Sequence, residues 1–421
     1  MQALFDAVNA ICAKIQIVSN WFWDFPCNLD WYGSIPILGN FSLAIILLVG
    51  TGIYFTFRLH FVQVHNFIFA VKVLMQRNHT RNGISSLTAF LLSTAMRVGP
   101  GNILGVTGAI SIGGPGALFW MWVSAFFGMA TSFAESTLSQ IFKEKRDNEY
   151  VGGLPFYARK LLNDSAAAGV ALSMLYIVYA LLCFPAQGFN TISAVGAIAS
   201  KISGVNIPTN SSLYWISFAV LIVITAVISF GGIKKVTKVT DRIVPVMAVI
   251  YVLTVIALTV GNLDRIPLFF SSVFTQAFAP DAVFGGAFGL ALSQGIKRGL
   301  MSNEAGQGTI TMPAAAAEVA HPCEQGCVQA LGVFLDTIVI CTMTALVILT
   351  SPEALPYGTD PGVRLTIRAF ANVYGDWVCI PIALSLCCFA FATVLGWGLY
   401  GARCAQYLLG KPVWKAFALV Q

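Results

Sequence analysis

The stretch from residue 84 to residue 113 reads ISSLTAFLLSTAMRVGPGNILGVTGAISIG, and it decides the fold. It is apolar and long enough to cross a bilayer as a helix, which takes about 20 residues at a rise of 1.5 Å per residue. Its middle, however, holds Gly99-Pro100-Gly101-Asn102. Proline lacks the amide donor of a helical turn and clashes with the preceding turn, whereas glycine tolerates non-helical angles. The sequence therefore predicts a membrane helix that is interrupted near its midpoint.

The composition of the whole chain points to the same environment. Of its 421 residues, 57% are hydrophobic and only 10% are charged. A soluble domain carries about 25% charged residues, so this chain is too poor in charge to cover a water-facing surface. The apolar runs are continuous rather than alternating, which favours helices over barrel strands. We therefore predict an all-α polytopic membrane protein whose surroundings are the lipid bilayer.

The remaining membrane spans follow from the other apolar runs. We predict them at about 38–57, 115–142, 168–200, 212–232, 242–261, 281–297, 322–350 and 378–402. The segment 265–280 is apolar but does not fit the alternation of spans, so we expect a surface or re-entrant helix on the outer side. The predicted units are an N-terminal extracytoplasmic segment, an extra helix with a cytoplasmic loop, a first repeat, an incomplete second repeat and the start of a further helix, at residues 1–35, 36–82, 84–262, 265–410 and 411–421.

The basic residues indicate how the spans are oriented. Most lie in alternate loops, where Lys and Arg mark the cytoplasmic side. They include Arg58, Lys72, Arg77, Arg81, Lys143, Lys145, Arg146, Arg159, Lys160, Lys234, Lys235, Lys238, Arg242, Lys297, Arg298, Arg403, Lys411 and Lys415. This pattern predicts a multi-pass protein of a bacterial-type plasma (inner) membrane with its N-terminus outside. Because the net charge of +6 is dispersed in this way, no nucleic-acid partner is expected.

A second interruption is predicted in the span 281–297, at Gly285, Gly286 and Gly289 around Phe288. Glycines at this spacing also occur where two membrane helices pack closely, and that alternative stays open. The spans 84–113 and 281–297 run in opposite directions with four spans between them. They fit the first members of two five-helix inverted repeats, in which transporters bind substrate and ion at broken helices.

Several motifs together resemble the alanine/glycine:cation symporter family, over about residues 40–410. They are Gly99-Pro100-Gly101-Asn102-Ile103, Gly113-Gly114-Pro115-Gly116-Ala117-Leu118-Phe119-Trp120-Met121-Trp122, Gly295-Ile296-Lys297-Arg298-Gly299, Ser302-Asn303-Glu304-Ala305-Gly306, Phe389-Ala390-Phe391-Ala392-Thr393 and Trp397-Gly398-Leu399-Tyr400-Gly401. The resemblance implies a LeuT-like inverted-repeat bundle with one extra N-terminal helix. It also implies uptake of alanine, glycine or a similar small amino acid, coupled to sodium or, in some members, to a proton, and no organic cofactor.

This chain departs from the family pattern at several positions. Pro100 stands where Thr is usual, Arg97 where a small residue is usual, and Ala392 where a hydroxyl often precedes Thr393. Of the family's Gly-Asn-Met-Val-Gln-Ala-Asn-Ser pattern, only Gln187 is in register. Family chains also continue through two more helices, so we expect the last two helices to be lacking. A divergent or truncated, non-transporting membrane subunit is therefore the alternative to a symporter.

The resemblance and the breaks together suggest the site residues. In LeuT-like folds the helix that corresponds to 378–402 donates a hydroxyl to sodium, which implies that Thr393 is a ligand together with the carbonyls of Gly99 and Gly101. The alternative for Thr393 is a bond to its own helix. The substrate is expected to contact Gly99, Pro100, Gly101, Asn102, Gln187, Phe288 and Trp397. For Asn102 a helix cap is equally compatible, and for Gln187, Phe288 and Trp397 ordinary packing is.

Charged residues inside the membrane are expensive and commonly functional. Arg97 and Glu135 lie at similar depths, so we predict an Arg97–Glu135 pair that acts in structure or as a cytoplasmic gate. Glu304 is predicted to be a gate or loop brace. For Asp336 two interpretations stay open, an ion or proton site and a carboxylate that is hydrogen-bonded to neighbouring helices.

Other function classes fit the sequence less well. An enzyme would need clustered His, Cys or carboxylates at one membrane face, and a channel would need a repeated pore segment or a charged ring. Neither pattern stands out. We therefore predict a secondary symporter that works by alternating access, with sodium and a small neutral amino acid as its ligands. The sequence carries no signal for the oligomeric state.

Overall fold

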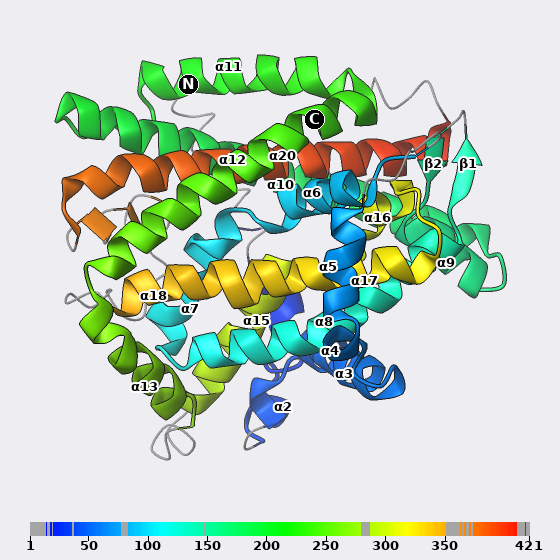
Figure 1. The fold of residues 1–421 in the computed structure, drawn as a ribbon, viewed down its shortest axis with the longest axis horizontal. Helices are drawn as coiled ribbons and strands as arrows, with labels where there is room; N and C mark the ends of the chain where they lie inside the picture. The colour runs from blue at the N-terminus through cyan, green and yellow to red at the C-terminus, as the bar shows by residue number, and fades with distance from the viewer. Residues whose placement is uncertain are drawn as a thin grey trace.

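The computed structural model is a bundle of long helices that lie roughly side by side (Figure 1). It describes residues 14–410 except 15–16, 19, 36–37, 77–82, 147–148, 279–286, 351–362, 364–365, 368–369 and 372–373, together with residue 417; of residues 287 and 288 it describes the backbone. Within these described residues, six helices are long and apolar enough to cross a membrane: Ala117–Ile141, Ala166–Ser203, Ser212–Ser229, Gly232–Val260, Pro322–Leu349 and Asp376–Leu409. This confirms the prediction of a polytopic membrane protein.

The N-terminal part precedes the first interrupted helix. It contains α2 (Asp30–Gly33), η1 (Leu38–Asn40), α3 (Leu43–Arg58), α4 (Val62–His65) and α5 (Phe67–Met75). The hydroxyl of Ser42 accepts the backbone N–H of Ile45 and so caps α3. Helix α3, the predicted extra helix, packs against α8, where the backbone of Phe127 lies too close to Gly52 for any side chain there.

The first interrupted helix consists of α6 (Ser86–Arg97), η2 (Pro100–Asn102) and α7 (Leu104–Gly113). Next come α8 (Ala117–Ile141) and the strands β1 (Glu144–Arg146) and β2 (Glu149–Val151), which pair antiparallel with Lys145 opposite Tyr150. A short helix, α9 (Leu154–Leu161), leads to α10 (Ala166–Ser203), α11 (Ser212–Ser229) and α12 (Gly232–Val260). Helix α12 begins ten residues before the predicted start at 242, because its first three turns are polar but still helical.

After η3 (Leu263–Arg265), the segment predicted as a surface or re-entrant helix forms α13 (Ile266–Ala277). Its apolar face buries Phe269, Val273 and Ala277, and the helix packs against α8 and α15. The chain continues with α15 (Ala287–Asn303), α16 (Thr311–Ala316), α17 (Pro322–Val333), the π-helix η4 (Phe334–Cys341), α18 (Thr342–Leu349), η5 (Asp376–Val378) and α20 (Cys379–Leu409). Residues 411–421, predicted to start a further helix, lie outside the described residues except for residue 417.

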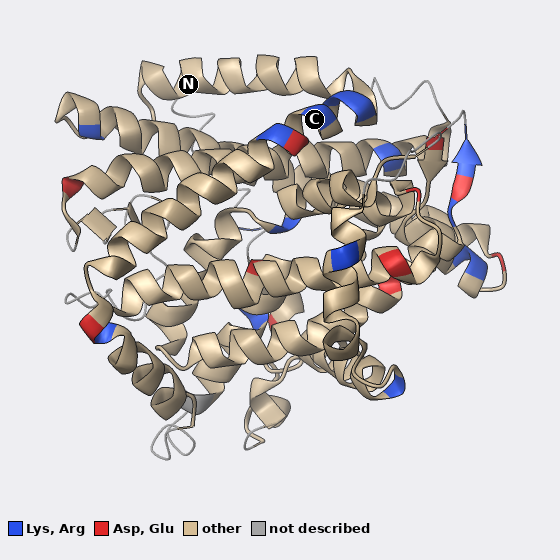
Figure 2. Cartoon of the chain, viewed as in Figure 1, with Lys and Arg blue, Asp and Glu red and all other residues tan. Residues whose placement is uncertain are grey.

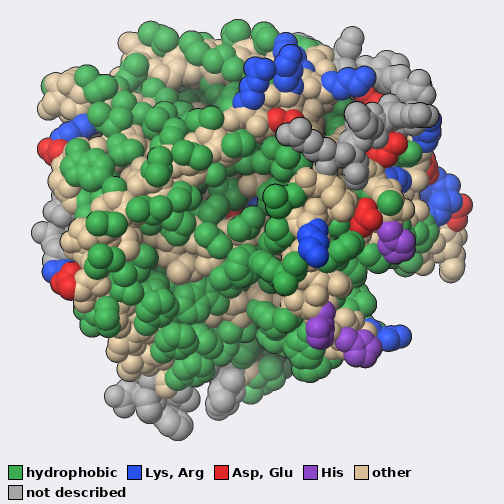
Figure 3. Space-filling view, in the orientation of Figure 1, with side chains coloured by type: hydrophobic (Ala, Val, Ile, Leu, Met, Phe, Trp, Pro, Cys, Tyr) green, Lys and Arg blue, Asp and Glu red, His purple; other side chains and the backbone are tan. Residues whose placement is uncertain are grey.

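The largest apolar cluster lies where the first interrupted helix meets the long helices. It includes Val98, Ile103, Met247, Tyr251 and Phe389 from α6–α7, α12 and α20. The outward faces of α10, α11 and α12 are instead apolar and exposed, as Figure 3 shows over much of the visible surface. Apolar side chains on the outside suit contact with lipid rather than water.

The charged residues gather toward one end of the bundle. Lys and Arg concentrate near β1, α9 and the beginning of α12 (Figure 2). We call this the basic end. The prediction for Lys297 and Arg298 is wrong, because both lie inside α15 rather than in a loop. Lys297 forms an ion pair of 3.1 Å with Asp24 of the N-terminal segment. Helix α15 continues to Asn303 and thus extends beyond its apolar part.

Candidate functional site

The predicted break at Gly99–Asn102 is present. Helix α6 ends at Arg97, and Gly99 has an extended backbone with φ −129° and ψ −166°. The side chain of Asn102 accepts the N–H of Gly99 at 2.9 Å, so the amide closes the break from within. Because Pro100 has no N–H, the carbonyl of Met96, four residues earlier, loses its usual helical donor. The break therefore exposes backbone polar groups deep inside the protein.

Thr393 of α20 lies directly against this break. Its hydroxyl donates to the carbonyl of Phe389 at 2.9 Å, as the alternative interpretation expected. The same oxygen also faces Gly99 so closely that a Cβ at Gly99 would lie 2.7 Å from it. A hydroxyl that donates to its helix keeps its lone pairs free as acceptors. The geometry thus places a hydroxyl oxygen beside the non-helical backbone, and the role of Thr393 as a sodium ligand stays a prediction.

The second interruption lies further along the chain than predicted. Helix α15 runs unbroken from Ala287 to Asn303, so the prediction of a break at Gly289 is wrong. Gly285 and Gly286 lie outside the described residues. Phe288 belongs to α15, but its side chain is not described. The glycines within α15 serve close packing instead, since Gly295 and Gly299 both lie against α8.

The helix is interrupted between Asn303 and α16. Glu304, Gly306 and Gly308 have φ values of +55°, +78° and +74°, so the backbone is left-handed at three positions in the loop. Glycine adopts such angles without strain, which accounts for two of the three. Asn303 supports the turn by accepting the N–H of Ala305 at 3.0 Å. The signal in the sequence is the motif Ser302–Gly306, although no proline marks the break.

The two interrupted helices lie side by side and run in opposite directions. Near one end, a Cβ at Gly113 would lie 3.1 Å from the Cα of Ala291, so α7 and α15 are in close contact. At the basic end, Ile84 and Ala317 form an isolated β-bridge. The start of one helix thus meets the end of the other. The predicted antiparallel arrangement of two broken helices is present, whereas the division into repeats at 84–262 and 265–410 stays a prediction.

Asp336 joins the two breaks. Its Oδ1 accepts from the side-chain amide of Asn102 at 2.7 Å, and its Oδ2 accepts from the hydroxyls of Ser302 and Thr337, each at 2.9 Å. Asn102 belongs to the first break, and Ser302 is the last residue but one before the second. The side chain is only 1% exposed. Both interpretations left open for Asp336 are compatible with this geometry, because a hydrogen-bonded buried carboxylate also attracts a cation.

The π-helix η4 carries Asp336, and such turns often occur at functional sites. At its end, the thiol of Cys341 lies 3.4 Å from the Asn102 amide and 3.4 Å from the Ser302 hydroxyl. One turn further, the hydroxyl of Thr344 donates to the carbonyl of Asn102 at 2.7 Å. The segment of η4 and α18 thus connects the two breaks through several short polar side chains.

No direct ion pair joins Arg97 and Glu135, although both residues are buried and described. Arg97 instead donates to the carbonyls of Asn303 and Gln329, at 3.1 and 3.0 Å, and to the hydroxyl of Ser132 at 2.9 Å. The guanidinium therefore binds the end of α15 and α17 rather than a carboxylate. The depth of a residue along its helix does not predict the direction in which its side chain points.

Glu135 and Glu304 both hold the second break. The carboxylate of Glu135 accepts the backbone N–H groups of Gly306 and Gly308, at 3.2 and 3.0 Å. Glu304 accepts the hydroxyl of Thr309 at 2.7 Å inside the same loop. Glu304 thus has the geometry of the predicted loop brace. Hydrogen bonds to a charged acceptor are worth about 1.5–3 kcal/mol each, so Glu135 contributes strongly to the shape of the break.

Trp397 and Gln187 have different surroundings. Trp397 is buried in an apolar cluster that also includes Met96, near the end of α6, and its ring packs against that of Tyr179 of α10. Gln187 is half-buried on α10 and accepts from the side chain of Asn190 at 3.3 Å. The structure thus places Trp397 in the same apolar cluster as the end of α6. It gives Gln187 a partner on its own helix.

The chain is similar to known proteins along most of its length. The model of the sodium:alanine symporter family matches residues 33–420. The amino-acid carrier protein AlsT of Bacillus subtilis is 39% identical over 370 residues, which cover 87% of this chain and 76% of that protein. The sodium/alanine symporter AgcS of Methanococcus maripaludis is 38% identical over 372 residues, which cover 87% of this chain and 80% of that protein.

A solved structure shows the same architecture. The crystal structure of MhsT in complex with L-phenylalanine matches with a TM-score of 0.62, at 15% sequence identity, and covers 81% of this chain and 78% of that chain. At this identity the similarity concerns the fold alone. It confirms the predicted LeuT-like bundle.

Proposed function

The chain belongs to the sodium:alanine symporter family, and from that premise we propose that it carries a small neutral amino acid, such as alanine or glycine, together with sodium. Two of the curated relatives are themselves described as an amino-acid carrier and a sodium/alanine symporter. These similarities favour a transporter over the non-transporting subunit that departures such as Pro100 left as an alternative.

The observation that supports this function best is the contact of two antiparallel, interrupted helices at Asp336. Helix α7 begins directly after the first break, so its free N–H groups carry partial positive charge and suit a substrate carboxylate. The carbonyl of Met96, without its helical donor, suits an ammonium group or a cation. A zwitterion needs both kinds of partner within a few ångströms, and a broken helix supplies them from the backbone of Gly99, Pro100, Gly101 and Asn102.

Sodium is proposed to bind between Thr393 and the backbone of Gly99 and Gly101. Sodium is a hard cation that prefers oxygen ligands, and the Thr393 hydroxyl lies against Gly99. Gly101 faces the other way, toward Ser302 of α15, with 3.7 Å between a Cβ at Gly101 and the Cα of Ser302. The break therefore lies between α20 and α15. The same backbone segment would thus contact both the sodium ion and the amino acid.

Asp336 offers a second place for a cation. It is a buried carboxylate whose three described partners, Asn102, Ser302 and Thr337, are all neutral. A cation or a proton there would be attracted by a charge that the membrane does not screen. We propose Asp336 as the group through which either coupling ion, sodium or a proton, affects both breaks at once.

Trp397 is proposed to close the site toward the basic end, since it belongs to the same buried apolar cluster as Met96, near the end of α6. Roles for Gln187 and Phe288 as walls of the substrate pocket stay proposals from the family resemblance. In the same way we propose that the basic end faces the cytoplasm of a bacterial-type cell, with the N-terminus outside.

The mechanism proposed is alternating access. A ligand can shift the balance between two conformations only through its different affinity for each. Sodium held by both α20 and the first break would favour the conformation in which the two are together. The substrate, bound by both breaks, would then permit the bundle to rearrange and release it at the basic end.

Uptake into proteoliposomes tests this proposal. The purified protein should take up radiolabelled alanine or glycine in a saturable way, and the rate should rise with sodium at a fixed membrane potential. Parallel assays with a proton gradient and no sodium distinguish the two coupling ions. Absence of uptake with every member of a small amino-acid panel would refute the transporter, and non-saturable flux would indicate a channel instead.

A further inference from the structure

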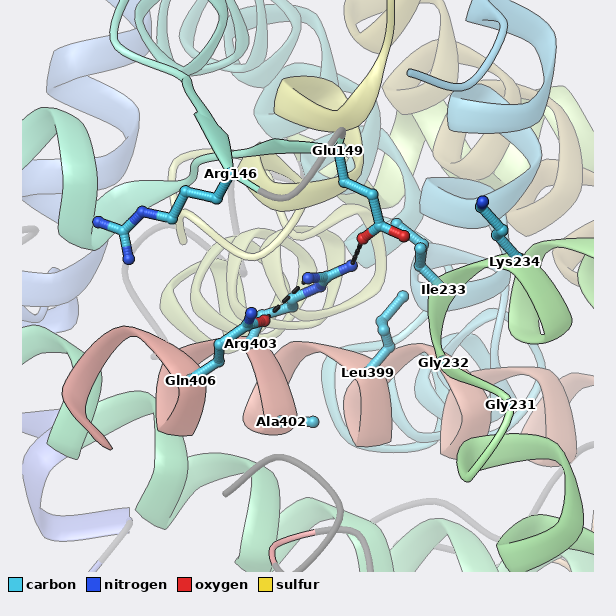
Figure 4. A pocket seen from close by; sticks show the side chains of 10 residues that line it. All are labelled: Arg146, Glu149, Gly231, Gly232, Ile233, Lys234, Leu399, Ala402, Arg403 and Gln406. Carbon is cyan, nitrogen blue, oxygen red and sulfur yellow. Dashed lines mark hydrogen bonds and ion pairs between the residues drawn. The ribbon is translucent and has the colours of Figure 1, made fainter. Parts of the chain in front are cut away.

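A cavity of about 200 Å³ lies at the basic end, outside the site described above. Three segments far apart in the sequence form its walls: the β1–β2 hairpin, the turn between α11 and α12, and the last turns of α20. Figure 4 shows Arg403 of α20 in the middle, with Arg146 on one side and Lys234 on the other. The sequence analysis used these residues for orientation only.

The charged side chains that line the cavity are mostly basic. Arg146, Lys234 and Arg403 line it together with one carboxylate, Glu149. Arg146 forms an ion pair of 2.6 Å with Glu144, which does not line the cavity. Arg403 is well placed rather than mobile, since it donates to Glu149 and to Gln406, each at 2.8 Å, and its side chain is 15% exposed. With Arg146 and Arg403 in ion pairs, Lys234 supplies the positive charge that remains at the cavity and that attracts an anion.

The backbone adds to this preference. Helix α12 begins at Gly232, and no side chain caps its first turn. The first N–H groups of a helix have no partner within the helix and carry partial positive charge. Gly232 and Lys234 line the cavity, so the start of a 29-residue helix borders the same space as the basic side chains.

The position of the cavity relative to lipid narrows the choice of anion. Helix α11, which leads into the turn, is among the most lipid-exposed elements, with an outward face that includes Ile216, Val220, Val223 and Val227. Most of the residues of α11 are not buried inside the protein. Figure 3 shows basic side chains toward the upper right of the view, beside a broad apolar surface. A ligand with an anionic head and apolar chains fits this combination, because each part meets matching groups.

We propose that this cavity binds the phosphate-bearing headgroup of an anionic phospholipid from the leaflet at the basic end, with the acyl chains along α11. The headgroup would join the hairpin, the start of α12 and the end of α20. Helix α20 also carries Thr393 and packs along α10 and α12. A bound lipid therefore stabilises the same helix that forms one side of the ion site.

Binding is measured on the purified full-length protein in detergent micelles that contain either phosphatidylglycerol or phosphatidylcholine. The midpoint of thermal unfolding should rise saturably with phosphatidylglycerol and not with phosphatidylcholine. Each basic residue near a lipid surface contributes about 1 kcal/mol, so Lys234→Gln should weaken the apparent affinity about fivefold. Lys238→Gln is the matched control, because Lys238 is equally exposed one turn further along α12 but does not line the cavity. Its affinity should stay unchanged.

A double variant tests the centre of the cavity. Arg403→Gln with Glu149→Gln removes an ion pair together and leaves no unpaired charge, so it should fold and still lose much of the lipid effect. Unfolding in detergent without lipid shows whether it folds. Equal stabilisation by phosphatidylcholine, equal loss in the Lys234 and Lys238 variants, or an equal effect of inorganic phosphate alone would each overturn the proposal. Because the readout is binding, a negative uptake assay does not affect the result.

Discussion

Replacing Thr393 by Val removes one hydroxyl from the proposed sodium site and leaves the shape of the side chain nearly unchanged. The hydroxyl donates only to Phe389 of its own helix, whose carbonyl keeps its backbone donor, so the cost in stability should be small. A neutral oxygen bound to a charged group is worth about 1.5–3 kcal/mol. The half-saturating sodium concentration should therefore rise roughly 10- to 150-fold.

The assay is initial-rate uptake of labelled alanine over a range of sodium concentrations, with glycine as a second substrate. Ser385→Ala is the matched control, because Ser385 is buried in the same helix and donates to Pro381 at 2.8 Å in the same way. The ratio of alanine to glycine uptake should change little in either variant. An unchanged sodium dependence in Thr393→Val, or an equal shift in Ser385→Ala, would refute the assignment.

Three further substitutions test the two breaks. Asp336→Asn should lower maximal uptake at saturating sodium at least tenfold, because the amide has no charge and one acceptor fewer for its partners; normal uptake would contradict a role in coupling. Glu135→Gln leaves a loop N–H without its acceptor, so the thermal unfolding midpoint should fall by an amount that corresponds to about 1–3 kcal/mol, and an unchanged midpoint would count against the loop contact. Pro100→Thr restores an N–H and adds a hydroxyl at the first break, and the preference between alanine and glycine should change; unaltered uptake would show that position 100 does not contact the substrate.

Much of the fold could be predicted from the sequence. Long apolar runs set the spans, and Pro100 with its flanking glycines marks the first break because proline cannot donate within a helix. The second break was harder to place. The motif Ser302–Gly306 is the signal there, but without a proline it does not separate Gly306 and Gly308 from the packing glycines of α15, whereas the positive φ angles do.

Side-chain partners were the least predictable part of the site. Arg97 and Glu135 lie at matching depths, but Arg97 donates to main-chain carbonyls and Glu135 accepts main-chain N–H groups. At an irregular backbone, main-chain N–H and carbonyl groups are open to hydrogen bonds from side chains, and no sequence pattern shows this. These groups compete with the oppositely charged side chain as partners. The central place of Asp336 depends on a π-helix, which changes the direction of side chains by one residue relative to a regular helix.

The bridge between Ile84 and Ala317 has a thermodynamic consequence for the release of substrate at the basic end. Three bonds close it: Ile84 N–H to the Ala316 carbonyl at 3.0 Å, Glu318 N–H to the Ile84 carbonyl at 2.9 Å, and Gly83 N–H to the Glu318 carboxylate at 3.0 Å. At about 1 kcal/mol net each, these hydrogen bonds disfavour separation of the two bridged segments by a factor of roughly 100. Without bound ligand, the segments at Ile84 and Ala317 would thus be separated in about 1% of the molecules, unless the rearranged form gains compensating contacts. Such a small fraction would limit the leak of a bound cation through the basic end when no amino acid is bound.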